Sequence, residues 1–142
     1  MHQRLIDNVK YSNLIMKILK IIFILSFLCI GGVNEKMTSN STIILASIYG
    51  SLEAISSPYL HLDVFWFISA ILTVCVLILV YRSKVYKERY LLVFYSFVLA
   101  VTTIYYSEIL YYKATPYFIV TSTIFVISSL ALIIRSFKPL DE

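Results

Sequence analysis

Long apolar runs are the feature that constrains this chain most. A hydrocarbon core about 30 Å thick is crossed by roughly 20 helical residues, and four runs have that length. They cover residues 14–33, 58–81, 90–112 and 115–134. With 60% hydrophobic and 14% charged residues in 142, the composition lies outside the range of soluble domains. The sequence therefore predicts an all-α integral membrane protein, with four transmembrane helices in an antiparallel bundle.

Little of the chain is left for anything besides this bundle. Three glycines and three prolines in the whole sequence leave no long flexible linker. Ser57-Pro58 and Thr115-Pro116 each place a capping side chain before a proline at the first helical position, which is a typical helix start. We expect residues 1–142 to form a single membrane domain with short connections, the shortest at Lys113 and Ala114 between the last two helices.

The lysines and arginines predict how the chain threads through the membrane, because cytoplasmic loops carry the excess of these residues. Because the chain crosses the membrane back and forth, its ends and loops alternate between the two sides. One side has only Lys36 and Lys113. The other side has Arg4, Lys10, Arg82, Lys84, Lys87, Arg89, Arg135 and Lys138. This bias predicts that both termini are cytoplasmic, and we expect the bacterial inner membrane as the location. Since orientation accounts for the basic residues, we expect membrane lipid and no nucleic acid as a partner.

The first apolar run has a competing interpretation. Lys17 and Lys20 lie in its opening turns, where their stems can extend toward the headgroups. A basic start, a charge-free stretch from Ile21 and the small residues Gly31 and Gly32 are also features of a cleaved signal peptide. Cleavage would leave three spans, whereas the bulky residues before Gly31 and the length of the run favour a retained first helix.

The outer segment 42–55 is apolar at three- and four-residue spacing, which predicts a short amphipathic helix on the outer side of the membrane. Its apolar residues are Ile44, Leu45, Ile48, Leu52 and Ile55, with Ser47, Ser51 and Ala54 opposite. Two interpretations remain open. The helix covers the bundle and does nothing more, or Ile44, Ile48 and Leu52 form a face on which a partner protein docks.

Glu108 is the acidic residue that interrupts the third run. Ionisable groups at membrane depth are costly and often functional. On a continuous helix, Tyr105 and Tyr112 are three and four residues away, close enough for their hydroxyls to bind the carboxyl group. Asp63 is expected at the same outer boundary. These four residues form a candidate ion or polar site; the alternative is a hydrated interfacial acid that pairs with Lys113.

No pattern of catalytic or ligand-binding residues accompanies these features. Intramembrane enzymes need a nucleophile with a base, or a metal held by carboxylates, and the sequence has neither arrangement. Cys29 and Cys75 form no CxxC pair and are expected as packed thiols, and His61 is the one histidine beyond the N-terminal segment. We therefore expect a protein that is not an enzyme and has no cofactor and no metal.

Two classes of function remain. The first is a protein that acts through contacts in the membrane, with another membrane protein or with its own copies, as an accessory or assembly subunit or as an immunity protein against a toxin. In architecture the chain resembles the four-span immunity proteins of pore-forming bacteriocins, which implies cytoplasmic termini, short loops and a protein partner. The second class is a small oligomeric transporter or channel with Glu108 as the ion-coupling acid. Four-span multidrug exporters carry their membrane acid in the first helix, and the first helix here has none.

Overall fold

The computed structural model describes residues 2–31, 38–54, 60–84, 87–111 and 113–137, and it describes side chains there except those of residues 2–12, 54 and 60–63. Within these ranges the chain is all-helical, and its one β-bridge, between Gly31 and Ser39, belongs to no strand. The helices are α1 (His2–Cys29), α2 (Asn40–Ala54), α3 (Leu60–Arg82), α4 (Arg89–Ser107) and α5 (Pro116–Phe137).

Three helical segments are long and apolar enough to cross a membrane: Val64–Arg82 of α3, all of α4 and all of α5. A membrane location is consistent with them. The first of the four predicted spans is not among them. Of α1, the structure describes side chains only over residues 13–29, a stretch shorter than the other three segments. The four-span expectation is therefore not confirmed.

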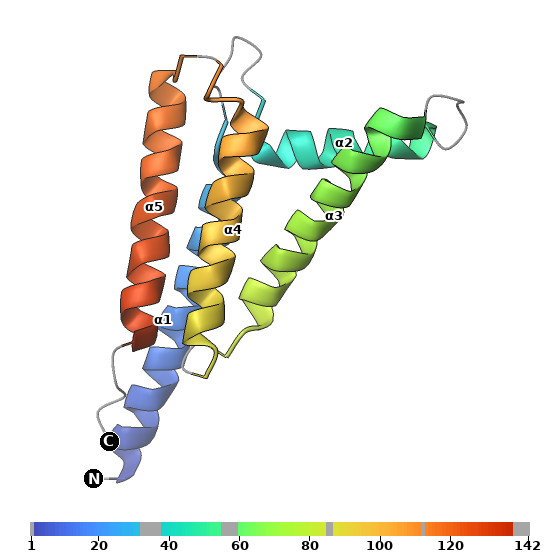
Figure 1. Cartoon of the computed structure of the whole chain (residues 1–142). Coiled ribbons are helices and arrows are strands. Elements are labelled where there is room, and N and C mark those ends of the chain that lie inside the picture. Colours follow the sequence, from blue (N-terminus) through green and yellow to red (C-terminus); the bar gives the residue numbers. More distant parts are fainter. Residues whose placement is uncertain (1, 32–37, 55–59, 85–86, 112, 138–142) are drawn as a thin grey trace.

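Successive long helices run in opposite directions (Figure 1). The end of α3, the start of α4 and the end of α5 lie together, and we call this the basic end because Arg82, Arg89 and Arg135 are there. The first half of α1 extends beyond the other helices at the same end. The end of α1, the end of α4 and the start of α5 lie at the opposite end, together with α2, and we call it the α2 end.

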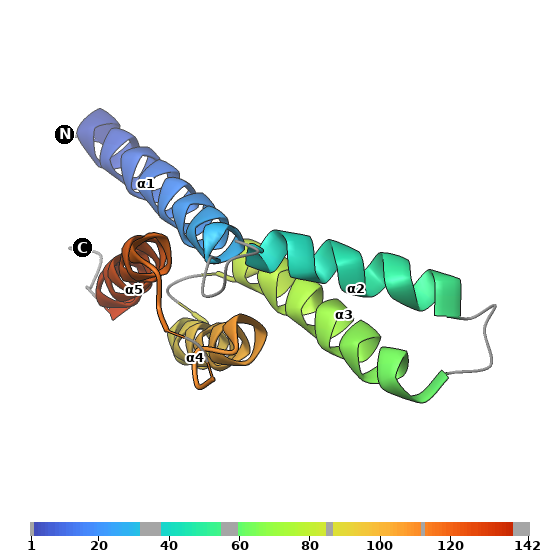
Figure 2. The ribbon, with the colours of Figure 1, turned by 90° about the horizontal axis from the view of Figure 1, so that it is seen from above.

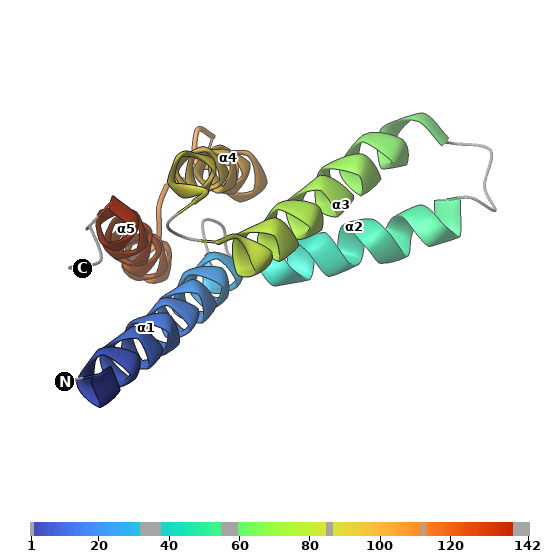
Figure 3. The ribbon, with the colours of Figure 1, turned by 90° about the horizontal axis from the view of Figure 1, so that it is seen from below.

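The helix α2 lies crosswise to α4 and α5 (Figure 1), and α3 leans away from α4 toward its own first residues. Seen from above and from below, α2 lies beside α3 (Figures 2 and 3), and α1 packs against α5. These are also the two most extensive helix contacts in the described chain. The fold is thus two helix pairs, with α4 contacting a member of each.

Small and aromatic residues join α1 to α5. The rings of Phe23 and Phe125 stack with their centroids 5.2 Å apart, and the ring of Phe27 lies 5.9 Å from that of Phe125. Beside them, the hydroxyls of Ser26 and Ser128 are 3.0 Å apart and share a hydrogen bond between the helices. Serine lets two helices approach closely within a membrane, and a bond between two hydroxyls satisfies both of them there.

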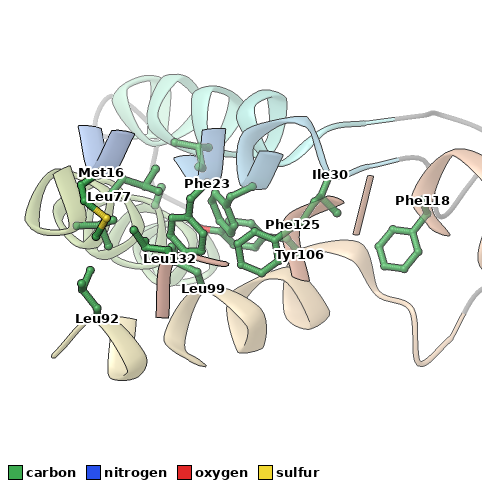
Figure 4. Close-up of a cluster of buried hydrophobic side chains, with 14 residues drawn as sticks. Met16, Phe23, Ile30, Leu77, Leu92, Leu99, Tyr106, Phe118, Phe125 and Leu132 are labelled. Atoms are coloured by element: carbon green, nitrogen blue, oxygen red, sulfur yellow. The ribbon is translucent and has the colours of Figure 1, made fainter. Parts of the chain in front are cut away.

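Buried apolar side chains extend along the bundle in one continuous cluster (Figure 4). Met16, Leu77 and Leu92 form its basic end, and Ile30 and Phe118 lie toward the α2 end. Every helix contributes to it, α2 through Ile44 alone. The cluster is narrow, since most large apolar side chains on α3, α4 and α5 face outward, as expected for helices surrounded by lipid rather than water.

A lysine joins α1 to α3 at the basic end. The side chain of Lys20 is buried, with 6% of its surface exposed, and its ammonium group donates hydrogen bonds to the carbonyl oxygens of Tyr81 and Ser83. These carbonyls lie at the C-terminus of α3, where a helix has acceptors without intrahelical partners and a partial negative charge. The expectation that Lys20 extends toward headgroups is replaced by this contact within the protein.

Helix ends follow the sequence signals at one boundary and depart from them at another. As predicted, α5 begins at Pro116, and the hydroxyl oxygen of Thr115 accepts a hydrogen bond from the Phe118 amide at 3.2 Å. The third run does not remain helical to Tyr112. It ends at Ser107, because Glu108 adopts a left-handed conformation with φ 50°, and the connection to α5 is longer than Lys113 and Ala114.

The return from α1 into α2 is tight and requires a glycine. The amide of Asn40 donates to the carbonyl of Ile30 at 2.7 Å, which brings Ser39 against Gly31. A side chain at Gly31 would collide with the backbone of Thr38 and Ser39. The start of α2 is therefore fixed directly to the end of α1.

Replacing Lys20 by Met should lower the free energy of unfolding by about 2 kcal/mol, because the carbonyls of Tyr81 and Ser83 lose their donor while they stay buried. Unfolding of the purified chain in mixed micelles, followed by circular dichroism during a denaturing-detergent titration, measures the change. Lys17→Met is the matched control, since the Lys17 side chain is exposed. A Lys20→Met protein as stable as the parent would contradict this role.

Candidate functional site

Of the four residues expected to form an acidic site, the structure describes the side chains of two, Glu108 and Tyr105. Glu108 is exposed and ends α4. Tyr105 is 43% exposed, and its ring lies 5.3 Å from that of Trp66 and 6.1 Å from that of Phe65, both on α3. The remaining two members of the proposed site, Tyr112 and the side chain of Asp63, lie outside the described residues. Since α4 ends at Ser107, Glu108 follows the helix rather than lying within it, and the site stays a prediction.

A buried polar cluster lies instead between α3 and α4. Tyr106 is 4% exposed, and its hydroxyl is 3.2 Å from both the Ser69 and the Thr73 hydroxyls. Thr73 also donates to the carbonyl of Ser69 at 2.8 Å. The ring of Trp66 stacks on that of Tyr106 with the centroids 6.1 Å apart. The tyrosine thus connects α4 to α3 where α3 leans away.

Asn40 forms the second part of this polar interior. It is 1% exposed, and its side-chain amide donates to the carbonyl of Phe27 at 3.0 Å and to the Thr103 hydroxyl at 3.5 Å. These bonds join the start of α2 to α1 and α4. In an apolar environment an unpaired amide costs several kcal/mol, so satisfied polar groups fix the relative positions of the helices.

The chemistry of this interior is limited to hydrogen bonding. Among the described side chains, this interior consists of hydroxyls, one amide and one indole. Within the described residues no group of three or more His, Cys, Asp or Glu side chains is placed to hold a metal ion. Cys29 and Cys75 are free and exposed, which corrects the expectation that they are packed thiols.

The face of α2 that was expected to dock a partner is divided by the fold. Ile44 is 5% exposed and belongs to the buried cluster, Ile48 is half-buried against it, and Leu52 is 59% exposed. Serines expected on the opposite face turn inward instead, since Ser51 is 7% exposed. The structure therefore does not confirm an outer amphipathic helix, although a helix is present over most of the expected segment.

The physical reason lies in how serine satisfies its hydroxyl. Ser47 and Ser51 donate to the carbonyls of Ile43 and Ser47 at 2.7 and 2.6 Å, one turn earlier in the same helix. A serine bonded in this way presents a small, almost apolar surface, and small residues let two helices approach closely. Hydrophobicity alone places these serines on the outer face, whereas packing against α3 places them inside.

What α2 exposes is a different apolar row. Leu45, Tyr49 and Leu52 follow one another at spacings of four and three residues and are 68%, 66% and 59% exposed. On the other side of the helix a groove of about 270 Å³ is lined by Ala46, Gly50 and Trp66, together with Ile43, Ser47 and Ser51. At Gly50 an added side chain would meet nothing within 4 Å, so the groove is open there.

Exposed apolar side chains also occur in the connection that follows α4. Leu110 and Tyr111 are 80% and 84% exposed, although they lie outside the helices that have membrane-spanning length. Both α2 and this connection are at the α2 end (Figure 1). This end therefore presents apolar surface where the long helices stop.

Comparison with known proteins gives no further guide: no family model, no curated protein and no solved structure matches this chain.

Replacing Tyr106 by Phe should destabilise the chain by about 0.6 kcal/mol, the typical contribution of a hydrogen bond within a membrane protein. The Ser69 and Thr73 hydroxyls lose a shared partner while the ring contact with Trp66 is retained. Tyr105→Phe is the matched control on the adjacent residue, whose ring makes the contacts with α3. Detergent-titration unfolding of both variants distinguishes them, and equal effects would show that the Tyr106 hydroxyl bonds do not stabilise the fold.

Proposed function

We propose that the protein is a non-enzymatic polytopic membrane protein that acts by binding another membrane protein, as an accessory subunit or an immunity-type protein. In this proposal α1, α3, α4 and α5 all span the membrane. The basic end is cytoplasmic, and α2 lies at the outer boundary. The gathering of Arg82, Lys84, Lys87, Arg89 and Arg135 at one end supports this orientation, because basic residues are retained on the cytoplasmic side.

The first helix crosses the membrane in this proposal in spite of its two lysines. Lys20 is neutralised in part by the carbonyls at the end of α3, so its charge does not need water. Lys17 is exposed and one turn nearer to the basic end, where its stem reaches the headgroups. From Met16 to Ile30 the helix supplies buried side chains to the same core as α3, α4 and α5.

The observation that carries the partner proposal is the apolar surface at the α2 end. On a helix surrounded by lipid tails, outward-facing apolar residues need no explanation. Leu45, Tyr49 and Leu52 lie on a helix that runs crosswise to the bundle. The proposed orientation puts this helix at the level where lipid tails give way to headgroups. Contiguous apolar surface exposed to a polar region marks an interaction site. Tyrosine and leucine there fit an aromatic or aliphatic surface on a partner protein.

Two observations weigh against the transporter alternative. Glu108 is exposed at the end of α4 and lines no polar interior, and the buried hydroxyls around Tyr106 and Asn40 have one another as partners. A coupling acid needs an enclosed path with groups that exchange a proton or cation with it.

Site-specific photo-crosslinking tests the proposal in the native membrane. A benzophenone-bearing residue at position 49 should yield one protein adduct of defined mass. The same residue at position 127 of α5, where Ile127 is 61% exposed, should yield lipid adducts only. Identical adduct patterns at the two positions would show that the α2 row has no partner of its own.

We expect the triple variant Leu45→Ala, Tyr49→Ala, Leu52→Ala to weaken the partner complex at least about tenfold, because an anchoring aromatic with its neighbours typically contributes more than about 1.4 kcal/mol. Affinity is measured by co-purification against increasing detergent or by titration once the partner is known. The matched control is Ile119→Ala, Val126→Ala, Leu130→Ala on the exposed face of α5, where the three side chains are 52% to 54% exposed. Equal loss in both triples would contradict docking through α2.

A further inference from the structure

We call the line of contact between α1 and α5 the seam. It continues toward the basic end past the stacked rings and the bonded serines described above. On α5, Thr121, Ile124, Ser128 and Arg135 follow one another at spacings of three, four and seven residues, so they share one face of the helix. Ser128 bonds Ser26 of α1, which shows that this face is turned toward α1. Arg135 is therefore on the row of α5 that follows the seam.

Part of this seam is a groove that opens to the membrane. It measures about 280 Å³ and lies between Ile22, Leu25, Ser26 and Cys29 of α1 and Thr121 and Ile124 of α5. Ser26 and Thr121 bond backbone carbonyls of their own helices, so their hydroxyls add little polarity to the lining. The remaining surface is aliphatic apart from the Cys29 thiol, which suits a hydrocarbon chain.

Arg135 supplies a cation at the other end of the same row. Its side chain is half-buried, and its Nε atom is fully buried without a hydrogen-bond partner. Arginine is the side chain best suited to bind a phosphate through several N–H groups at once. From Ile124 to Arg135 the helix rises about 16 Å over 11 residues, close to half of a hydrocarbon core about 30 Å thick.

We propose that the α1–α5 seam binds one anionic phospholipid, with the phosphate at Arg135 and an acyl chain that follows the seam into the groove at Ile22 and Ile124. Each half of the site then meets the part of the lipid that its chemistry fits. The distance along α5 between the groove and Arg135 is close to the depth of one leaflet. The guanidinium of Arg135 gains an anionic acceptor, and the aliphatic groove gains a chain that fills it.

Three other cations of the basic end are placed differently from Arg135. The Arg89 guanidinium lies over the rings of Tyr90 and Phe137, 5.4 and 5.3 Å from their centroids, and Lys20 is bonded to α3. Arg82 is exposed at the end of α3, a helix that does not line the α1–α5 groove. Arg82 thus carries a positive charge at the same end of the fold but is not on either helix that lines the groove.

Native mass spectrometry tests the proposal on the full chain, released from nanodiscs of equal parts phosphatidylglycerol and phosphatidylcholine. The parent protein should retain one phosphatidylglycerol in preference to phosphatidylcholine. Arg135→Gln should reduce this retention about fivefold, as expected for one basic side chain at a membrane surface, and Arg135→Lys should restore part of it. Arg82→Gln, the matched control, should retain as much lipid as the parent.

A second variant tests the groove. Ile124→Trp fills it without a change of charge and should also lower retention of phosphatidylglycerol. Thermal unfolding of the parent in lipid-free detergent distinguishes the source of the phosphate. The proposal requires stabilisation by added phosphatidylglycerol and none by inorganic phosphate at the same concentration. It is overturned by unchanged retention in Arg135→Gln or Ile124→Trp, by equal loss in Arg82→Gln, or by equal stabilisation by phosphate.

Discussion

The contact of Lys20 with the C-terminus of α3 is the interaction on which the arrangement of the helices depends. A helix end in an apolar environment leaves carbonyl groups without donors, and a lysine in an apolar run leaves an ammonium group without acceptors. Each is unfavourable alone. Because the ammonium of Lys20 binds the carbonyls of Tyr81 and Ser83, the two requirements satisfy each other and the basic ends of α1 and α3 are held together. The α2–α3 pair is thereby joined to the α1–α5 pair.

At the opposite end the same requirement acts through neutral groups. Asn40 joins the start of α2 to α1 and α4, and Tyr106 joins α4 to α3 across the place where the two helices separate. With α3 held at its C-terminus and near its middle, at Ser69 and Thr73, α2 lies across the end of the bundle and turns Ile44 inward. Leu45, Tyr49 and Leu52 then face outward. The surface proposed to bind a partner is thus a consequence of where the buried polar groups find their partners.

The apolar runs and the capping residues were enough to predict an all-helical chain and the start of α5 at Pro116. The apolar spacing predicted a helix at 42–55, and the structure has one at Asn40–Ala54. The rotation of α2 about its axis was not predictable, because a hydrophobicity pattern treats Ser47 and Ser51 as polar residues and places them on the outward face. Their bonds to the preceding turn make them small packing residues.

The end of α4 at Ser107 was missed because no proline or glycine marks it; Glu108 adopts the left-handed conformation that glycine usually takes. Neither the roles of Lys20 and Asn40 nor the partners of Tyr106 follow from spacing, since these bonds join residues from 13 to 63 positions apart.

The proposal that this protein acts through what it binds is supported by the apolar surface at the α2 end and by buried polar groups that bond one another. The measurement that tests this most directly is the mass and composition of the particle when the chain is extracted with its surrounding membrane in polymer-bounded discs. A particle that contains a second protein in fixed stoichiometry is the result that the account requires. A particle that contains only copies of this chain, or a single copy with lipid, would contradict it.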